Sequence, residues 1–538
     1  MHSTEGTRKE GLMALALVLL SVTAITQAQQ VGCGDNITSS LVLDADLTCQ
    51  GSALTVGADS VIIDCDGHAI RYAANESGHA ISASAVFGIA VKNCILTEGS
   101  DLPDAAAVSM YNVGSASIVN NTITTSGAGS DAILAETVFK STFINNSIRV
   151  ANASGISAFS SFFLEIENNS ISSGTAYRGG VFLVAGGVVS LVSNRIDVRD
   201  GYGFGVVLMN LTGASFPDPD NPDVMRYYNL SRVADNGVIM GGDSSTGIYV
   251  SGSSVEAVGN AIRMDGANSI GLYAESVSEN TFGSNSISAS GNFSYGISLK
   301  SSDRSAIIEN NITVSGESSY GVSSISGVGN IFSGNSVRSL ANGSFPVLAT
   351  SSLSERFEGN NLSNGDSGFS MMLVDSTDAW LVDNRLSNVS MYDGNATFLG
   401  NAFIGGVPKV VTLNVTNIVL SNASMGNDWG RSSAPFFVRG EDVDDERFAD
   451  MYSLSLSLGE NETGTAPSTG AGVDLGLIAQ ILIGLVILIA IVAVAMRLYK
   501  HRREGAGPQQ ERLENERTTR PSQEQQEKAA GPQERKEG

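Results

Sequence analysis

The sequence predicts an all-β protein built around a parallel β-helix, a solenoid of about 13 coils. The first observation is an Asn-x-(Ile/Leu/Val) triplet that recurs about every 25 residues. Between Asn236 and Asn384 the gaps are 24, 25, 25, 25, 25 and 24 residues, and the register continues upstream to Asn93 across one gap of 42. A fixed period this short is typical of a solenoid. The asparagines are Asn93, Asn121, Asn146, Asn169, Asn194, Asn236, Asn260, Asn285, Asn310, Asn335, Asn360 and Asn384.

The second observation is a column of glycines with the same period, each followed by an apolar residue. The glycines are Gly155, Gly180, Gly205, Gly247, Gly271, Gly296 and Gly321. The segments that follow alternate between apolar and other residues, as in Gly-Ile-Tyr-Val at 247–250. This period of two indicates strands with one buried face, and no run has the 3.6-residue period of an amphipathic helix. Leucine-rich repeats are the rival solenoid, but their L-x-x-L-x-L pattern is absent.

The asparagine column has a physical explanation. A residue at the same turn of every coil can hydrogen-bond its side-chain amide to the coils above and below. Asparagine also tolerates the left-handed backbone conformation that tight turns require. At roughly 4.8 Å between paired strands, about thirteen coils form a rod on the order of 60 Å long.

The N-terminal 28 residues have the pattern of a secretory signal peptide. Arg8 and Lys9 precede an apolar run, and small residues near Ala28 provide a cleavage site. An uncleaved membrane anchor is the alternative. Residues 29–70 are expected to form the N-terminal cap and the first coil.

All four cysteines lie in the first coils, on the exported side. Four cysteines allow three pairings. Cys65 and Cys94 occupy equivalent places on neighbouring coils, which favours Cys65–Cys94 together with Cys33–Cys49. Such bonds would hold the exposed end of the solenoid. Free buried thiols are the alternative, and the absence of a C-x-x-C pair disfavours a zinc site.

Residues 71–403 are expected to form the coils, with an insertion at about 213–232 that accounts for the gap of 42. Residues 404–458 lose the register and are expected to form a C-terminal cap region. Residues 459–473 have the Gly/Thr/Pro/Ser composition of a linker.

Residues 474–496 are long and apolar enough for one transmembrane helix. The basic residues that follow place the tail, 497–538, in the cytoplasm, and its composition predicts disorder. We therefore expect a single-pass protein of the cell membrane with most of the chain outside. The net charge of −24 disfavours nucleic acid as a partner.

The sequence resembles the secreted right-handed parallel β-helix proteins of the pectin-lyase-like superfamily, especially the NosD-type repeat proteins of prokaryotic surfaces. The resemblance covers roughly residues 33–430. It rests on Cys33-Gly-Asp with Leu47-Thr-Cys49, Val61-Ile-Ile-Asp-Cys-Asp-Gly-His68, Val91-Lys-Asn-Cys-Ile95 and Gly426-Asn-Asp-Trp-Gly430. The superfamily implies polysaccharide binding or processing, and the NosD type implies copper loading. The Asn-Thr-Asp, Gly-His-Gly and Arg-Ile-Lys signatures of polygalacturonases are absent, as is the Gly-Ile-Gly-Asp-type ending of the subfamily.

One candidate ligand-binding surface follows from the strand alternation. The position two residues after each column glycine should point outward, which would place Phe182, Val207, Tyr249 and Tyr273 in an exposed strip about 15 Å long. Aromatic faces in a line suit sugar rings. Tyr227 and Tyr228 of the insertion add further stacking faces. The alternative is that the insertion packs onto the strip; in either case the two are expected to touch.

A candidate metal site lies in the insertion. Asp218, Asp220 and Asp223 offer the hard oxygen ligands that Ca²⁺ prefers, so Ca²⁺ is a candidate cofactor although none is required. A solvated Pro/Asp loop is the alternative. A copper site is disfavoured, because the exported part has only two histidines, His68 and His79, and no Met or Cys cluster at ligand spacing.

Candidate catalytic residues are Asp197, Arg199, Arg195 and Asp200, which should project outward together. A lyase needs a base near a cation, and a hydrolase needs two carboxylates. The alternative is a solubilising strand face with ion pairs. Seventeen Asn-x-Ser/Thr sequons occur outside the predicted membrane span. The candidates for glycosylation are Asn120, Asn145, Asn168, Asn292, Asn311 and Asn361.

These observations favour a membrane-anchored surface protein that binds glycans without cleaving them or forms part of the envelope. The alternative is a membrane-tethered polysaccharide lyase or glycoside hydrolase. A third hypothesis is a structural coat or scaffold whose partners are neighbouring surface proteins.

Overall fold

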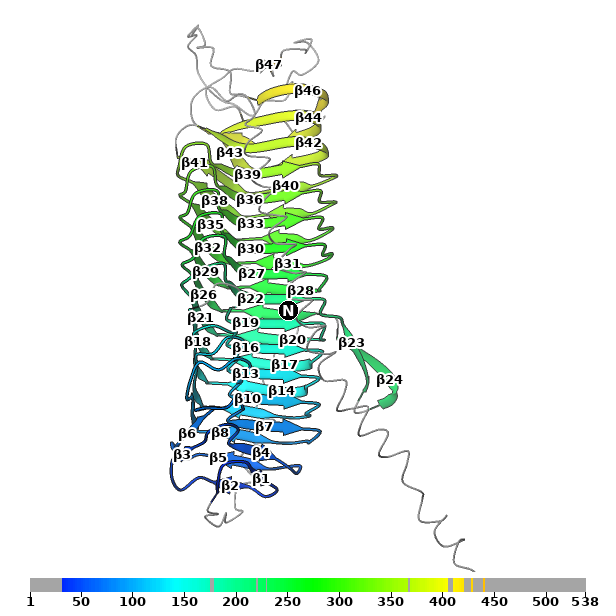
Figure 1. Ribbon diagram of the computed structural model, residues 1–538. Helices are drawn as coiled ribbons and strands as arrows, with labels where there is room; N and C mark the ends of the chain where they lie inside the picture. The colour runs from blue at the N-terminus through cyan, green and yellow to red at the C-terminus, as the bar shows by residue number, and fades with distance from the viewer. Residues whose placement is uncertain are drawn as a thin grey trace, which may run out of the picture. The chain divides into compact units, whose positions relative to one another are not determined.

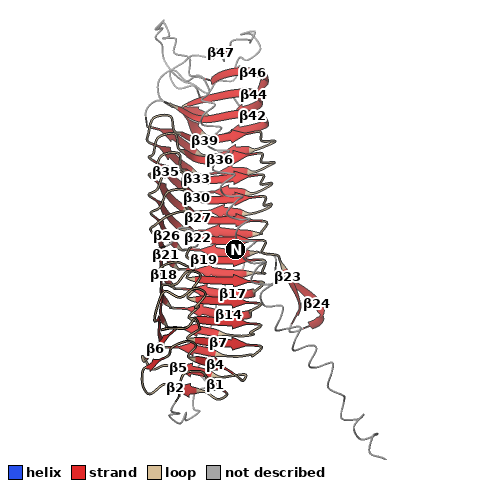
Figure 2. Cartoon of the chain, viewed as in Figure 1, coloured by secondary structure: helices blue, strands red, loops and turns tan. Residues whose placement is uncertain are grey.

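The computed structural model describes residues 31–174, 179–218, 221–228, 230–365, 368–404, 410–419, 427–428 and 439–440. The chain divides into two units, Met1–Gly459 and Glu460–Gly538, and every described residue lies in the first. These residues form a stack of coils made of β-strands and turns, with no helix among them (Figures 1 and 2). The predicted signal peptide, linker, transmembrane helix and tail lie outside the described residues. Among the described residues, no helix is long and apolar enough to span a membrane.

Each coil contributes one strand to each of three faces, and equivalent strands pair in parallel. The first face contains β1 (Asp35–Ile37), β4 (Leu54–Val56), β7 (Ile81–Ser84), β10 (Val108–Tyr111), β13 (Ile133–Glu136), β16 (Ile156–Phe159), β19 (Val181–Val184), β22 (Phe204–Met209), β27 (Thr246–Ser251), β30 (Ile270–Glu275), β33 (Tyr295–Lys300), β36 (Tyr320–Ile325) and β39 (Phe345–Thr350).

The second face follows the first along each coil. It contains β2 (Leu41–Val42), β5 (Ile62–Asp64), β8 (Ala90–Lys92), β11 (Ser117–Val119), β14 (Phe139–Ile144), β17 (Phe162–Glu167), β20 (Val189–Val192), β25 (Ser231–Ala234), β28 (Val255–Val258), β31 (Thr281–Gly283), β34 (Ala306–Ile308), β37 (Ile331–Ser333) and β40 (Arg356–Glu358). Three long strands then run through both faces, and a short strand pairs with the last of them: β42 (Phe369–Val382), β44 (Asn388–Leu399), β46 (Val410–Val419) and β47 (Arg439–Gly440).

The third face is a separate sheet of fifteen strands, so fourteen steps separate its first strand from its last. It contains β3 (Leu47–Thr48), β6 (Ala69–Tyr72), β9 (Ile95–Glu98), β12 (Thr122–Thr125), β15 (Ser147–Val150), β18 (Ser170–Ser173), β21 (Arg195–Val198), β26 (Gly237–Met240), β29 (Ala261–Met264), β32 (Ser286–Ala289), β35 (Asn311–Val314), β38 (Ser336–Ser339), β41 (Asn361–Asn364), β43 (Arg385–Leu386) and β45 (Ala402–Phe403). The stack is slightly longer than the roughly thirteen coils predicted, because its strands continue through β46.

The core is the narrow space enclosed by the three faces. Inward side chains such as Ile248 and Val250 are fully buried, as the alternation predicts. The column glycines face the same space. A Cβ on Gly271 would lie 2.6 Å from the side chain of Ile287 on the third face, and the other column glycines are equally close to an Ile or Val there. Glycine is therefore needed at this column for close packing.

The asparagine column forms a continuous buried ladder at the corner before the third face. Asn285 donates from Nδ2 to the Ala257 carbonyl and to Asn310 Oδ1, both at 2.9 Å. Its own Oδ1 accepts bonds from the backbone N–H and Nδ2 of Asn260, both at 3.0 Å. The pattern repeats from Asn121 to Asn384 and continues through Asn401 to Asn427.

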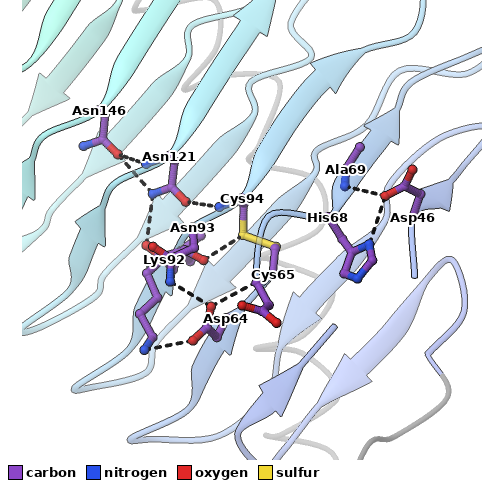
Figure 3. The surroundings of a disulfide bond; sticks show 12 residues. Asp46, Asp64, Cys65, His68, Ala69, Lys92, Asn93, Cys94, Asn121 and Asn146 are labelled. Carbon is purple, nitrogen blue, oxygen red and sulfur yellow. Dashed lines mark hydrogen bonds and ion pairs between the residues drawn. A yellow bond between two sulfur atoms is a disulfide. The ribbon is translucent and has the colours of Figure 1, made fainter. Parts of the chain in front are cut away.

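The upstream end of the ladder differs from the prediction. Asn93 was assigned to the ladder, but Cys94 occupies that position and its N–H donates to Asn121 Oδ1 at 3.0 Å. Asn93 lies one residue earlier in the left-handed turn, at φ 56°, and donates to Asp64. Figure 3 shows this end, where the Cys65–Cys94 disulfide lies before Asn121 and Asn146, the first two asparagines of the ladder. The pairings Cys65–Cys94 and Cys33–Cys49 are both as predicted.

The insertion forms an antiparallel hairpin, β23 (Ala214–Asp218) and β24 (Asn221–Tyr228). In Figure 1 it projects from the side of the stack. The coils on either side of it remain paired, with Arg195 of β21 opposite Gly237 of β26, so the insertion does not interrupt the register.

The ladder predicts a large effect of losing one amide. We expect Asn285→Ala to lower the free energy of unfolding by about 3 kcal/mol, because several buried groups lose their partners together. Asn311→Ala, at an exposed position in the next coil, should change the free energy of unfolding by only a few tenths of the loss expected for Asn285→Ala. Urea denaturation followed by circular dichroism would compare the two variants. Equal midpoints would contradict the structural role of the ladder.

Candidate functional site

The predicted aromatic strip is buried. Tyr249 and Tyr273 point outward from the first face, but each is only 4% exposed and Val207 is 1% exposed. The Tyr249 ring lies against Phe204 and Tyr273, with centroid distances of 5.9 and 5.4 Å. Its hydroxyl lies 3.2 Å from Glu275 Oε2, and burial raises its pKa to about 12. The expectation of an exposed strip is therefore wrong at Val207, Tyr249 and Tyr273, and the two tyrosine rings pack against each other.

Phe182 is half-buried and lies 6.0 Å from the Phe159 ring. Tyr227 and Tyr228 belong to β24, which pairs with β23. Their side chains lie outside what the structure describes, so the expected contact between the insertion and the strip stays a prediction.

The candidate calcium ligands fall in the same hairpin. Asp218 ends β23 opposite Asn221, and Asp223 lies in β24, while Asp220 lies outside the described residues. No group of three or more His, Cys, Asp or Glu side chains suited to a metal ion occurs among the residues whose side chains are described. His68 instead pairs with Asp46 at 3.2 Å, as Figure 3 shows.

The candidate catalytic residues form an ion pair. Arg199 donates from Nε and Nη2 to the two oxygens of Asp197 at 2.8 and 2.7 Å. This bond lowers the pKa of the Asp197 carboxyl, which makes it a weaker base. Arg195 and Asp200 are exposed on either side, and Asp197 itself is buried. The geometry matches the alternative of a strand-face ion pair.

An open groove lies elsewhere, at the corner between the first and second faces. It has a volume of about 370 Å³, and its walls include the rings of Phe87 and Phe139. The two rings are 57% and 38% exposed. Gly114 pairs with both residues from the coil between them, so the wall there is bare backbone. A Cβ on Gly114 would lie 2.5 Å from the Phe87 ring.

The corner geometry explains why these rings face outward. Residues in the left-handed conformation flank each position, for example Ala85 at φ 53° and Gly88 at φ 71° around Phe87. Val113 and Val138 point into the core, and the residue after each therefore points out. The Phe139 ring meets Phe163 edge-on at 5.6 Å, which supports it from the next coil.

Polar groups share the groove with the rings. Asp59, Asn112 and Thr137 line it, and Asp59 Oδ1 accepts the Phe87 N–H at 2.7 Å. A flat apolar surface bordered by hydrogen-bonding groups is suited to a sugar ring, which has an apolar face and polar edges. The sequence does show Phe87, Gly114 and Phe139 at spacings of 27 and 25 residues. The sequence pattern does not single them out, because alternation marks strand positions and not corner positions.

Comparison with known families agrees with this architecture. The family model described as "Right handed beta helix region" matches residues 106–214. This part of the chain is a right-handed β-helix region. The same strand register extends on both sides of it, so the described stack is one right-handed parallel β-helix. The groove lies partly within the matched residues. No curated protein sequence matches the chain significantly.

Several solved structures are similar to the chain at low identity. The periplasmic alginate epimerase AlgG is 11% identical over 71% of this chain and 78% of that chain, with a TM-score of 0.29. Tailspike protein 3 of bacteriophage CBA120 is 11% identical over 76% and 55% of the two chains, with a TM-score of 0.28. The A-module of the Azotobacter vinelandii mannuronan C-5 epimerase AlgE4 is 11% identical over 72% and 90%, with a TM-score of 0.26. Likeness at this level carries no functional assignment.

Glu98 and Glu355 are buried carboxylates outside the groove. Glu98 caps a turn by accepting the N–H groups of Ser126 and Gly127 at 2.6 and 3.0 Å. Glu355 is 1% exposed and ends a second interior ladder, where it accepts Asn330 Nδ2 at 3.0 Å and the Ser324 hydroxyl. Burial raises the pKa of Glu355 to about 7, and its Oε2 has no hydrogen-bond partner. Neither carboxylate lines the groove, so both are structural.

Glu355 predicts a measurable dependence of stability on pH. An unfolded glutamate titrates near 4.5 and the folded one at about 7, so between these values the folded protein holds a proton that the unfolded chain releases. Stability should therefore fall by about 3 kcal/mol as the pH rises from 4.5 to 7. Glu355→Gln should remove this component. Urea midpoints of wild type and variant, measured across this range, would diverge; parallel curves would contradict the assignment.

Proposed function

We propose that this protein is a cell-surface glycan-binding protein that does not cleave its ligand. The observation that carries the proposal is the groove between Phe87 and Phe139, where two exposed rings flank a bare backbone and polar groups lie within reach. The predicted signal peptide and the apolar segment 474–496 support attachment to the membrane with the β-helix outside. The ion pair between Arg199 and Asp197 provides no free base, which supports a non-catalytic role.

The charge of the groove favours a class of glycan. Asp59 contributes a carboxylate, and the chain carries a net charge of −24. An anionic polymer such as a polyuronate would be repelled by both. Neutral β-1,4-linked hexoses present flat faces of axial C–H groups, which stack on aromatic rings. The proposed ligand is therefore a neutral, linear β-linked glycan.

The test is direct binding by the full-length chain, purified in detergent. Fragments of glucomannan, which is neutral and linear, should bind, and polygalacturonate should not, with or without Ca²⁺. Phe87→Ala and Phe139→Ala should each weaken glucomannan binding by about tenfold, the equivalent of about 1.4 kcal/mol. Isothermal titration calorimetry would give the affinities.

Two controls make the result specific. Tyr202→Ala removes an aromatic ring that is 47% exposed but lies between β21 and β22, away from the groove, and should bind as wild type does. Reducing-end assays on the same mixtures should show no new chain ends. Release of oligosaccharides would overturn the non-catalytic proposal, and binding that survives loss of both rings would exclude the groove as the site.

A further inference from the structure

A second exposed apolar cluster lies on the same side of the stack, near its C-terminal end. Val328, Ile331, Leu353 and Trp380 are 40%, 42%, 43% and 44% exposed. Val328 pairs with Leu353 at the corner, and the register of the second face places Arg356 between Ile331 and Trp380. We call these four residues the Trp380 patch. Large apolar side chains gathered at one exposed place commonly mark a binding surface.

A charged pair lies among the residues of the Trp380 patch. Arg356 Nε donates to Glu358 Oε2 at 2.8 Å, and both side chains are partly exposed. The pair provides hydrogen-bond donors and acceptors with no net charge. The patch and the groove at Phe87 thus share exposed apolar side chains beside hydrogen-bonding groups, and the pair at the patch adds no net charge.

The groove and the Trp380 patch lie on one edge of the β-helix. The corner position lies three residues before one aligned column of the second face, which contains Ala90, Ser117, Thr142, Ile331 and Trp380. Phe87, Gly114 and Phe139 occupy this position near the N-terminal end, and Ser278, Asp303, Val328, Leu353 and Thr377 occupy it further along. The hairpin rejoins the stack at this same edge, between Tyr228 and Ser231, so it lies between the two sites.

The separation follows from the register. The strands from the groove to the patch are β14, β17, β20, β25, β28, β31, β34 and β37, which gives seven steps. At roughly 4.8 Å per step, Phe139 and Val328 lie on the order of 34 Å apart. A short oligosaccharide in the groove cannot reach the patch, whereas an extended polymer along the edge can contact both.

We infer that the Trp380 patch is a second subsite for the same neutral, linear glycan, and that the protein selects long chains over short ones. This inference rests on the proposed function of the groove. Once one part of a polymer occupies the groove, another part is held near the patch at a high effective concentration, so two weak contacts reinforce each other. Both sites lie at the same corner position of their coils, on the edge that also carries the hairpin.

The test compares glucomannan fragments of graded length on the full-length chain. Wild type should bind fragments that span 34 Å at least tenfold more tightly than fragments that fill the groove alone. Trp380→Ala should lose the extra affinity for long fragments and keep the affinity for short ones. Phe87→Ala should weaken the binding of long and short fragments alike. Ile331→Ser tests the patch a second time without removing an aromatic ring. Ile95→Ala, an exposed apolar residue on the third face, should leave the length dependence unchanged.

Three other results would each contradict the inference. A length gain that is the same in wild type, Trp380→Ala and Ile331→Ser would overturn the second subsite and leave the groove as the binding site. Absence of binding by fragments of every length would overturn the proposed function as well. If the wild type self-associates and Trp380→Ala is monomeric in sedimentation experiments, the patch is an interface between copies and the inference is wrong.

Discussion

The structure depends on a buried ladder of asparagine amides that passes from one coil to the next. Each ladder side chain donates to the asparagine of the following coil and accepts from the preceding one, and it also satisfies a backbone carbonyl. A buried corner would otherwise leave peptide groups without partners. Because an amide is both donor and acceptor, one residue type can repeat indefinitely without an unsatisfied end inside the stack. The ladder thus holds the same corner of successive coils in register, whether its asparagines are 17, 25 or 42 residues apart.

A single stack of coils has few positions at which a side chain can contact a ligand. The inward positions are occupied by the core, and the column glycines are required for close packing of the first face against the third. Outward positions on strands lie beside equivalent positions 4.8 Å away, so large side chains there bury one another, as Tyr249 and Tyr273 do. At the corner between the first and second faces, left-handed residues turn one side chain per coil outward. Phe87, Phe139, Val328 and Leu353 are exposed for this reason.

The repeat made the fold predictable from the sequence. The spacing of the asparagines and glycines predicted the parallel coils, and the equivalent places of Cys65 and Cys94 predicted their disulfide. The shift from Asn93 to Cys94 was not visible, because coils differ in length by a few residues before the register settles. The exposed aromatic strip was predicted wrongly, since alternation gives the direction of a side chain and not what packs beside it. The groove was missed because corner positions have no alternation to mark them.

We propose that the ligand binds along one edge of the β-helix. Hydrogen–deuterium exchange of the full-length chain, with and without long glucomannan, tests this proposal most directly. We expect slower exchange at the corner segments 85–88, 112–115 and 137–140 and around Leu353 and Trp380, with no change along the third face. Protection spread over the third face, or confined to the first-face strands around Tyr249, would contradict it.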